Sequence, residues 1–362
     1  MNHPRTPREA AAVSSRAARR QATRLALGGA VLTVTTGVSI VAVAGSLPLV
    51  YQVLPLALSV VVLGLPHGAV DHLVLPRARA EPVSRRSLAF VGLVYLAVGG
   101  LYAAVWLIAP AFAFALFLLV TVVHWGQGDV AALVEFLDPP HLDARSNRYL
   151  TLVVRGGVPM LVPLIAFPDQ YAFVARSILG VIDPGAAVAL EPAFTSTART
   201  AVAAGFGSIL VASLALGFVR TTAGGRTGWL VDAVETLALV GYFSLVPPVL
   251  AIGLYFCFWH SLRHVLRTML LDATASAALA RDEFGTAARR FARDATPLTL
   301  GGLAVLVGVG LLVPTTPAST ADLLGIYLVA IAVLTLPHVV IVTLLDRERG
   351  IWSPRSSRAS GR

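Results

Sequence analysis

Long apolar stretches alternate with short polar ones along almost the whole chain. A helix needs roughly 20 mainly apolar residues to cross the hydrocarbon core of a bilayer. Prolines separate several neighbouring stretches, at Pro110, at Pro247 and Pro248, and after Pro314. The pattern predicts an all-α, polytopic integral membrane bundle of about ten transmembrane helices, over residues 24–46, 49–74, 87–108, 110–136, 149–167, 198–219, 229–246, 248–270, 296–314 and 320–345.

The polar segments predict the orientation of these helices. Arginines gather at both ends of the chain and in alternate loops. In the segment 168–197, by contrast, the charged residues are mainly acidic. Loops rich in Lys or Arg lie on the cytoplasmic side of a membrane. We therefore expect cytoplasmic N- and C-termini, and a short surface helix over residues 271–294 on that side. The predicted parts are a basic tail (1–23), a transmembrane catalytic domain (24–346) and a second basic tail (347–362).

Composition supports a multi-pass protein of the cell membrane. The chain has 362 residues, of which 56% are hydrophobic and 13% charged, against about 25% charged in soluble domains. Its net charge of +9 would suggest nucleic acid in a soluble protein. Here the loop arginines account for the charge, so we expect the lipid bilayer as a partner and no nucleic acid. The one cysteine, Cys257, excludes a disulfide within the chain and fits a packing role.

Six of the eight histidines lie inside the apolar stretches: His67, His72, His124, His260, His264 and His338. An imidazole in hydrocarbon is costly unless it is hydrated, paired or bound to a metal. All six lie in the second, fourth, eighth and tenth predicted helices, which run in the same direction; the five compared in depth are His67, His124, His260, His264 and His338. At ~1.5 Å of rise per residue, their depths agree within about 10 Å. We therefore predict that they share a metal ion.

Spacing narrows the choice of ligands. His260 and His264 are four residues apart, so they share one face of a helix. His67 and His72 are five apart, about 140° around a helix, and do not face one ion together. We take His67 as the ligand because Pro66 and Gly68 flank it, and interpret His72 as a solvated residue near the membrane edge. His141 and His3 lie in segments that we expect to be exposed.

Carboxylates inside the predicted helices are candidates for a second layer around the ion. A ligating histidine usually donates its other N–H to a carboxylate or carbonyl, and Asp71, Asp129 and Glu235 are suitably placed. Asp71 and Asp129 have an alternative role as ordinary interface charges, or as partners of Arg155 and Arg263. Imidazole ligands alone leave a divalent ion its full charge, which suits Fe²⁺ that binds O₂. A closed four-histidine zinc site would instead be structural.

Four separated motifs resemble one known family. They are G-L-P-H-G-A-V-D (64–71), H-W-G-Q-G-D (124–129), Y-F-C-F-W-H-S-L-R-H (255–264) and L-P-H (336–338), and the similarity also includes residues 235–250. They resemble the Brp/Blh family of multi-pass bacterial and archaeal β-carotene 15,15′-dioxygenases, over roughly residues 50–346. One departure is Arg155, where some relatives have histidine.

The resemblance implies a specific reaction. Fe²⁺ would be held by His67, His124, His260 and His264, with His338 in the outer shell or substrate pocket. O₂ would cleave the central double bond of β-carotene to give two molecules of all-trans-retinal. Aromatic residues near the ligands would line a tunnel for the polyene: Trp125, Tyr255, Phe256, Phe258 and Trp259. The product suggests a retinal-binding microbial rhodopsin as a further partner.

Other classes of membrane protein also carry buried histidines. A di-iron hydroxylase or desaturase normally has about eight in paired boxes, and a haem-b protein needs only two on facing helices. A transporter would use intramembrane charges and an internal repeat, and the chain shows no repeat. Structural histidines are the remaining alternative. Metal content separates these classes.

Overall fold

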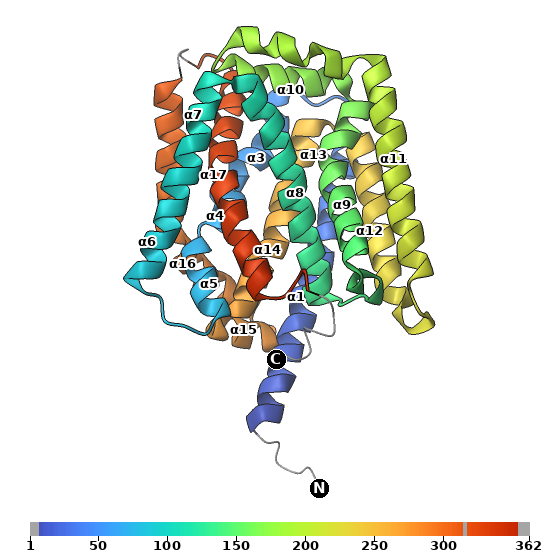
Figure 1. Ribbon diagram of the computed structural model, residues 1–362, viewed down its shortest axis with the longest axis vertical. Coiled ribbons are helices and arrows are strands. Elements are labelled where there is room, and N and C mark those ends of the chain that lie inside the picture. The colour runs from blue at the N-terminus through green and yellow to red at the C-terminus, as the bar shows by residue number, and fades with distance from the viewer. Residues whose placement is uncertain (1–6, 314–316, 354–362) are drawn as a thin grey trace.

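Long helices stand side by side and form one bundle in the computed structural model (Figure 1), which describes residues 7–313 and 317–353. Ten helical segments in these ranges are long and apolar enough to cross a membrane, and the same ranges contain no strand. The predicted all-α class with ten spans is therefore confirmed. The start of the first span and the end of the last lie at the same end of the bundle. That this end faces the cytoplasm stays a prediction.

Seven of the ten spans are continuous helices. They are α1 (Pro7–Ala44), α8 (Pro110–Phe136), α9 (Arg145–Ala166), α11 (Ser196–Val219), α12 (Arg226–Leu245), α16 (Phe284–Leu312) and α17 (Thr320–Glu348). Short 3₁₀ segments connect some of them, namely η2 (Pro140–Asp143) and η4 (Ala223–Gly225).

The other three spans are composite. The second is broken into α2 (Leu49–Gln52), α3 (Leu54–Ser59), α4 (Gly64–Gly68) and α5 (Asp71–Ala78). The third contains a π-helical turn, η1 (Tyr95–Gly99), between α6 (Arg85–Val94) and α7 (Gly100–Ile108). The eighth contains another, η5 (Phe256–Ser261), between α13 (Pro248–Tyr255) and α14 (Leu262–Leu271). Breaks of this kind are frequent at functional sites.

Two helices extend beyond their predicted starts. The helix α1 begins at Pro7, inside the stretch expected as a basic tail, and α16 begins at Phe284, inside the expected surface helix. The rest of that expected helix forms α15 (Ala273–Ala280). Ala and Arg are strong helix formers, so these helices continue past their apolar cores. Residues 1–6 and 354–362 of the predicted tails, and position 314 of the ninth predicted span, lie outside the described residues.

The segment 168–197 is more ordered than the loop expected there. It forms α10 (Pro168–Gly180) and the 3₁₀ segment η3 (Pro184–Phe194). Figure 1 shows α10 lying across the upper end of the bundle. One face of α10 is buried, through Ala172, Ala175, Ile178 and Leu179. This spacing is that of an amphipathic helix, and it makes α10 a cover over the helices below.

The eighth span is the centre of the bundle. In its most apolar stretch 83% of the residues are buried, against 11% in α11 and in α16, which lie at the periphery. The helices α4 and α8 pack against its lower part, η5 and α14, and side chains of α17 reach α14 through the pairs His264–His338 and Arg267–Asp346. Every span that carries a predicted metal ligand therefore meets at this central helix.

Candidate metal centre

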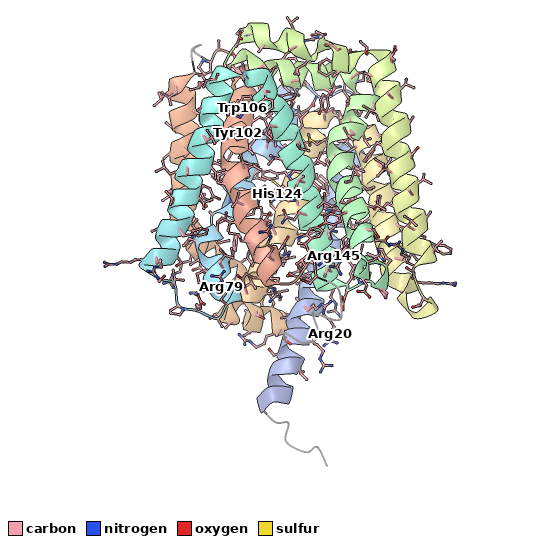
Figure 2. The ribbon with its side chains drawn as sticks, in the orientation of Figure 1. Arg20, Arg79, Tyr102, Trp106, His124 and Arg145 are labelled. Carbon is pink, nitrogen blue, oxygen red and sulfur yellow. The ribbon has the colours of Figure 1, made fainter. Side chains whose placement is uncertain are left out.

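Five histidines gather where these helices meet. His67 lies on α4, His124 on α8, His260 on η5, His264 on α14 and His338 on α17. All five side chains are buried. Figure 2 shows His124 about midway along the bundle, whereas Arg20, Arg79 and Arg145 lie toward its lower end. The contacts among the five rings confirm the common depth expected from the sequence.

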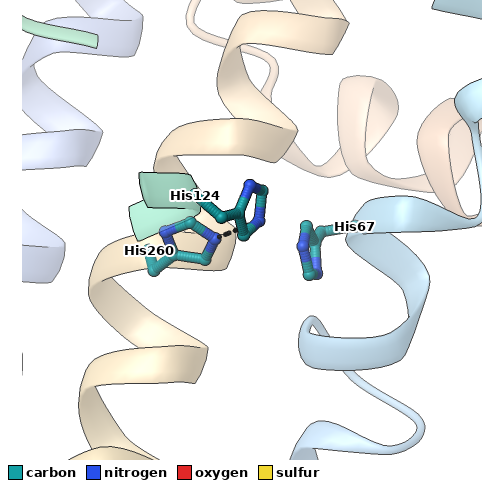
Figure 3. Close-up of side chains that lie close together, drawn as sticks. All are labelled: His67, His124 and His260. Carbon is teal, nitrogen blue, oxygen red and sulfur yellow. Dashed lines mark hydrogen bonds between the residues drawn. The ribbon is translucent and has the colours of Figure 1, made fainter. Parts of the chain in front are cut away.

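His67, His124 and His260 form one compact group. One nitrogen of each ring lies within 4.8 Å of the others, and Figure 3 shows the three rings turned toward a common space. The Nε2 atoms of His124 and His260 are 3.1 Å apart. Donors from three helices at this separation lie within reach of a single cation.

The fourth predicted ligand, His264, belongs to a neighbouring group. One ring nitrogen of His264 and one of His338 lie with a carboxylate oxygen of Asp71 within 4.8 Å of one another. The π-helical turn η5 ends between His260 and His264. It changes the angle between them from that of a regular α-helix. The two groups adjoin at His67, whose ring centroid is 5.5 Å from that of His260 and 5.4 Å from that of His264.

Local breaks in the chain present these rings to one another. In α4 the Nδ1 atom of His67 hydrogen-bonds the carbonyl oxygen of Gly64 and lies 3.3 Å from Ser261 Oγ. Nε2 of His67 is therefore the free nitrogen. On α8, a Cβ at Gly128 would lie 3.1 Å from Cε1 of His260. Glycine at this position leaves room for that imidazole.

Several ring nitrogens in the cluster are buried and have no hydrogen-bond partner. They are Nε2 of His67, Nδ1 of His124, both nitrogens of His264 and Nε2 of His338. Buried polar atoms in folded proteins are nearly always paired, and in hydrocarbon an unpaired one is especially costly. Neutral imidazole nitrogen is a good ligand for Fe, Zn, Cu and Ni ions. The donor set therefore fits a transition-metal ion.

Asp129, the second of the predicted carboxylates, belongs to a buried ionic network beside the cluster. Its carboxylate accepts hydrogen bonds from Trp259 Nε1 at 3.1 Å, and from Arg155 and Arg263 at 3.4 Å. Glu235 accepts from Arg263 at 2.6 Å and from Arg155 at 3.0 Å. Both carboxylates therefore pair with arginines rather than with an imidazole. The network fixes α14 against α8, α9 and α12, and so positions the two histidines on the eighth span.

The sequence prediction for His141 was wrong. We expected an exposed residue, yet His141 is buried and its Nε2 lies 3.0 Å from Asp232, which also accepts from Arg155 at 2.7 Å. The sequence contains one signal for this burial. Asp232 is a carboxylate inside a predicted span, where a charge needs a partner. His72 is half-buried on α5, and it belongs to neither of the two groups that could hold a metal.

A second ionic network lies below the cluster and was not anticipated. Arg267 on α14 pairs with Asp346 at 2.6 Å and with Glu135 at 3.1 Å. Gln127 donates to Asp346 at 2.9 Å. These bonds connect α8, α14 and α17, the helices that carry His124, His264 and His338.

An apolar cavity reaches from the imidazole cluster up to α10. His67, His124 and His338 line it, together with mostly carbon-rich side chains of α3, α8, α10, α13 and α17. The hydroxyls of Thr121 and Thr335 donate to carbonyls of their own helices, at 2.7 Å each. These two hydroxyls are therefore not free donors toward the cavity. The space suits a long apolar molecule with the histidines at one end.

The aromatic residues expected around this space divide into two layers. Trp125 and Phe256 line the cavity. Tyr255 and Trp259 lie behind them, with ring centroids of Trp125 and Tyr255 5.0 Å apart and those of Tyr255 and Trp259 6.0 Å apart. Phe258 is half-buried. The outer layer holds the inner one in place.

Residues 58–346, a range that contains all five histidines, match the model of a family described as β-carotene 15,15′-dioxygenase. The chain belongs to this family. It is 42% identical over 327 residues to the probable β-carotene 15,15′-dioxygenase Blh of Halobacterium salinarum, covering 90% of this chain and 92% of that protein. It is 34% identical to the probable dioxygenase Brp of the same species, over 85% and 87% of the two chains.

A bacterial relative is more distant. The β-carotene 15,15′-dioxygenase of the uncultured marine bacterium 66A03 is 26% identical over 206 residues, which are 57% of this chain and 65% of the relative. No solved structure is detectably similar to the chain. Membership of the β-carotene 15,15′-dioxygenase family makes this protein an oxidoreductase.

Proposed function

We propose that the protein cleaves the central 15,15′ double bond of β-carotene with O₂ and releases two molecules of all-trans-retinal. The observation that carries the proposal is the buried imidazole cluster at one end of an apolar cavity. The names of the similar proteins support the same substrate. The hydroxyls of Thr121 and Thr335 in the cavity lining are already hydrogen-bonded within their own helices. The cavity therefore suits an apolar polyene that is dissolved in the bilayer.

His67, His124, His260 and His264 would hold Fe²⁺ in this proposal. The bound ion supplies the redox chemistry through which O₂ reacts with the polyene. The reaction is balanced without external electrons, because each oxygen atom of O₂ ends as one aldehyde oxygen. This agrees with a site enclosed by helices, where no electron donor has to dock.

The protein's own residues bind and orient the substrate. Phe256 and Trp125 contact the space beside the imidazoles and present flat faces to a conjugated chain. The residues of α10 close the upper end of the cavity, and so limit how far one ring end of the carotenoid travels. The apolar wall excludes water from the reacting double bond.

The test of the reaction is retinal formation in bacteria that accumulate β-carotene. Expression of the chain should replace the yellow-orange carotenoid by retinal, identified by chromatography and mass. Purified protein in detergent should lose this activity on chelation and regain it with Fe²⁺ but not with Zn²⁺. Persistent carotenoid and no retinal, despite membrane-inserted protein, would contradict the assignment.

The two adjacent donor groups favour one alternative, a two-metal hydroxylase or desaturase. His67, His124 and His260 would hold one ion, and Asp71, His264 and His338 the other. Metal content distinguishes the two proposals: one iron per chain with retinal as product supports the dioxygenase, and two irons with a hydroxylated or desaturated carotenoid support the alternative. A Soret band would indicate haem instead.

The ten candidate spans indicate the location, and the proposed product suggests a protein partner. We propose that the enzyme is a multi-pass protein of the cell membrane and that its retinal supplies a microbial rhodopsin. Co-expression with an opsin should give a coloured, retinal-bound rhodopsin without added retinal. An opsin that stays colourless beside active enzyme would remove this partner.

A further inference from the structure

His338 lies inside the imidazole cluster rather than at its margin. Its ring centroid is 4.9 Å from that of His67, 4.9 Å from that of His124 and 5.2 Å from that of His264. It therefore lies on the side of its own group that adjoins His67 and His124. A single ion that His264 shares with His67 and His124 would also lie beside His338.

The far side of the His338 ring is fixed by two other residues. Nδ1–H of His338 donates to Asp71 Oδ2 at 2.8 Å, and the hydroxyl of Tyr95 donates to the same oxygen at 2.7 Å. This contact places the ring proton on Nδ1, because a carboxylate oxygen accepts. Nε2 is then left with its lone pair, and it is buried without a partner.

Histidines that bind metals commonly have the same arrangement, in which the nitrogen away from the metal hydrogen-bonds a carboxylate. A carboxylate behind the ring fixes its tautomer and orientation and raises the basicity of the coordinating nitrogen. Space for the ring is also provided by α4, because a Cβ at Gly68 would lie only 3.2 Å from Nδ1 of His338. Neither a residue that merely lines a cavity nor a packing residue requires a fixed, unpaired Nε2.

We propose that His338 is a fifth imidazole ligand of the metal centre, oriented by Asp71 and Tyr95. The inference rests on the proposed metal centre, and changes what that centre can do. Four imidazoles leave two open positions on an octahedral ion, whereas five leave one. A centre of five imidazoles would therefore leave O₂ one position, beside a cavity that His67, His124 and His338 line.

The test measures metal binding without carotenoid. Wild type and His338→Ala are purified in detergent, stripped with a chelator and titrated with Fe²⁺ and with Co²⁺ against a competing chelator. We expect one ion per wild-type chain, at least tenfold weaker binding in the variant, and a changed Co²⁺ absorption spectrum because one nitrogen is lost. Added imidazole should restore part of the affinity. Asp71→Asn should weaken binding by about tenfold, as loss of an outer partner typically does.

Matched variants separate ligation from folding. His338→Gln keeps most of the side-chain volume and a polar contact to Asp71, and should show the same loss of affinity with an unchanged melting temperature in detergent. His72→Ala should bind the metal as wild type does. Wild-type affinity and spectrum in both His338 variants would overturn the proposal, and so would two ions per wild-type chain. A wild type that binds one ion but forms no retinal refutes only the proposed reaction.

Discussion

Gly126 of α8 and Gly156 of α9 face each other where these two helices cross. A Cβ at Gly156 would lie 1.8 Å from the carbonyl oxygen of Val122 and 3.0 Å from the amide nitrogen of Gly126. A Cβ at Gly126 would in turn lie 2.0 Å from the carbonyl oxygen of Leu152. The two backbones are thus in direct contact, as small residues allow in membrane bundles. His124 is two residues away, so this contact sets its position.

Gly156→Ala should therefore separate α8 from α9 and displace His124. The methyl group meets backbone, which cannot move aside, and overpacking of this kind costs about 1–3 kcal/mol or more. We expect a lower melting temperature in detergent and a loss of most retinal formation. Gly205→Ala on α11 is the matched control, because nothing lies within 4 Å of its Cβ position. Equal behaviour of the two variants would refute the close packing.

His124→Ala should abolish retinal formation, while His72→Ala should retain most of it. His124 lies in the group of three donors, and His72 on α5 is outside both groups. Retinal per milligram of membrane-inserted enzyme is the measurement. Loss of activity in both variants to the same degree would show that the two histidines do not differ as the geometry requires.

Arg263→Met should destabilise the protein strongly. The substitution removes one of the two guanidinium groups that pair with the buried carboxylates Glu235 and Asp129. Removing one partner of a buried ion pair lowers the free energy of unfolding by about 3–5 kcal/mol. Arg176→Met removes a partner from the exposed pair with Glu191, for which about 0–1 kcal/mol is expected. The yields of folded protein and the melting temperatures in detergent compare the two. A mild Arg263 variant would mean that Arg155 alone satisfies both carboxylates.

Ala175→Phe should shorten the cavity at its upper end. Ala175 is buried on α10 and lines the cavity, so a phenyl ring there occupies space meant for a carotenoid end. We expect cleavage of β-carotene to fall at least tenfold, and cleavage of a shortened apocarotenal to fall much less. Phe173→Ala, at an exposed position of the same helix, should change neither rate. Equal losses with both substrates would argue against a length limit at α10.

Hydropathy and proline positions were sufficient to predict the spans. The predicted helix 110–136 coincides with α8, because Pro110 occupies the first turn, where proline is favoured. Hydropathy alone does not show where a span is broken, although Pro66 and Gly68 predict a break beside His67. Residues 49–74 appear as one apolar stretch, yet Gly64 and Pro66 belong to a separate short helix. The π-helical turn before His264 likewise depends on tertiary packing.

The candidate site was predictable in its members and not in its grouping. Depth and residue type predict that His67, His124, His260, His264 and His338 lie together. The place of His264 in the second group follows the π-helical turn η5, and the contact of Asp71 with His338, 267 residues apart in sequence, depends on how α5 and α17 pack. Buried pairs such as His141 with Asp232 escape a hydropathy argument for the same reason, because a short polar segment predicts exposure unless its partner is known.

The imidazoles are dispersed over the chain, from the second span to the tenth. In the proposed five-imidazole centre, the donor set is incomplete until α17, the last span in the sequence, has packed against the others. Metal capture is then a late event in biogenesis. A polypeptide arrested before α17 would be embedded in lipid and still lack one of the five proposed ligands.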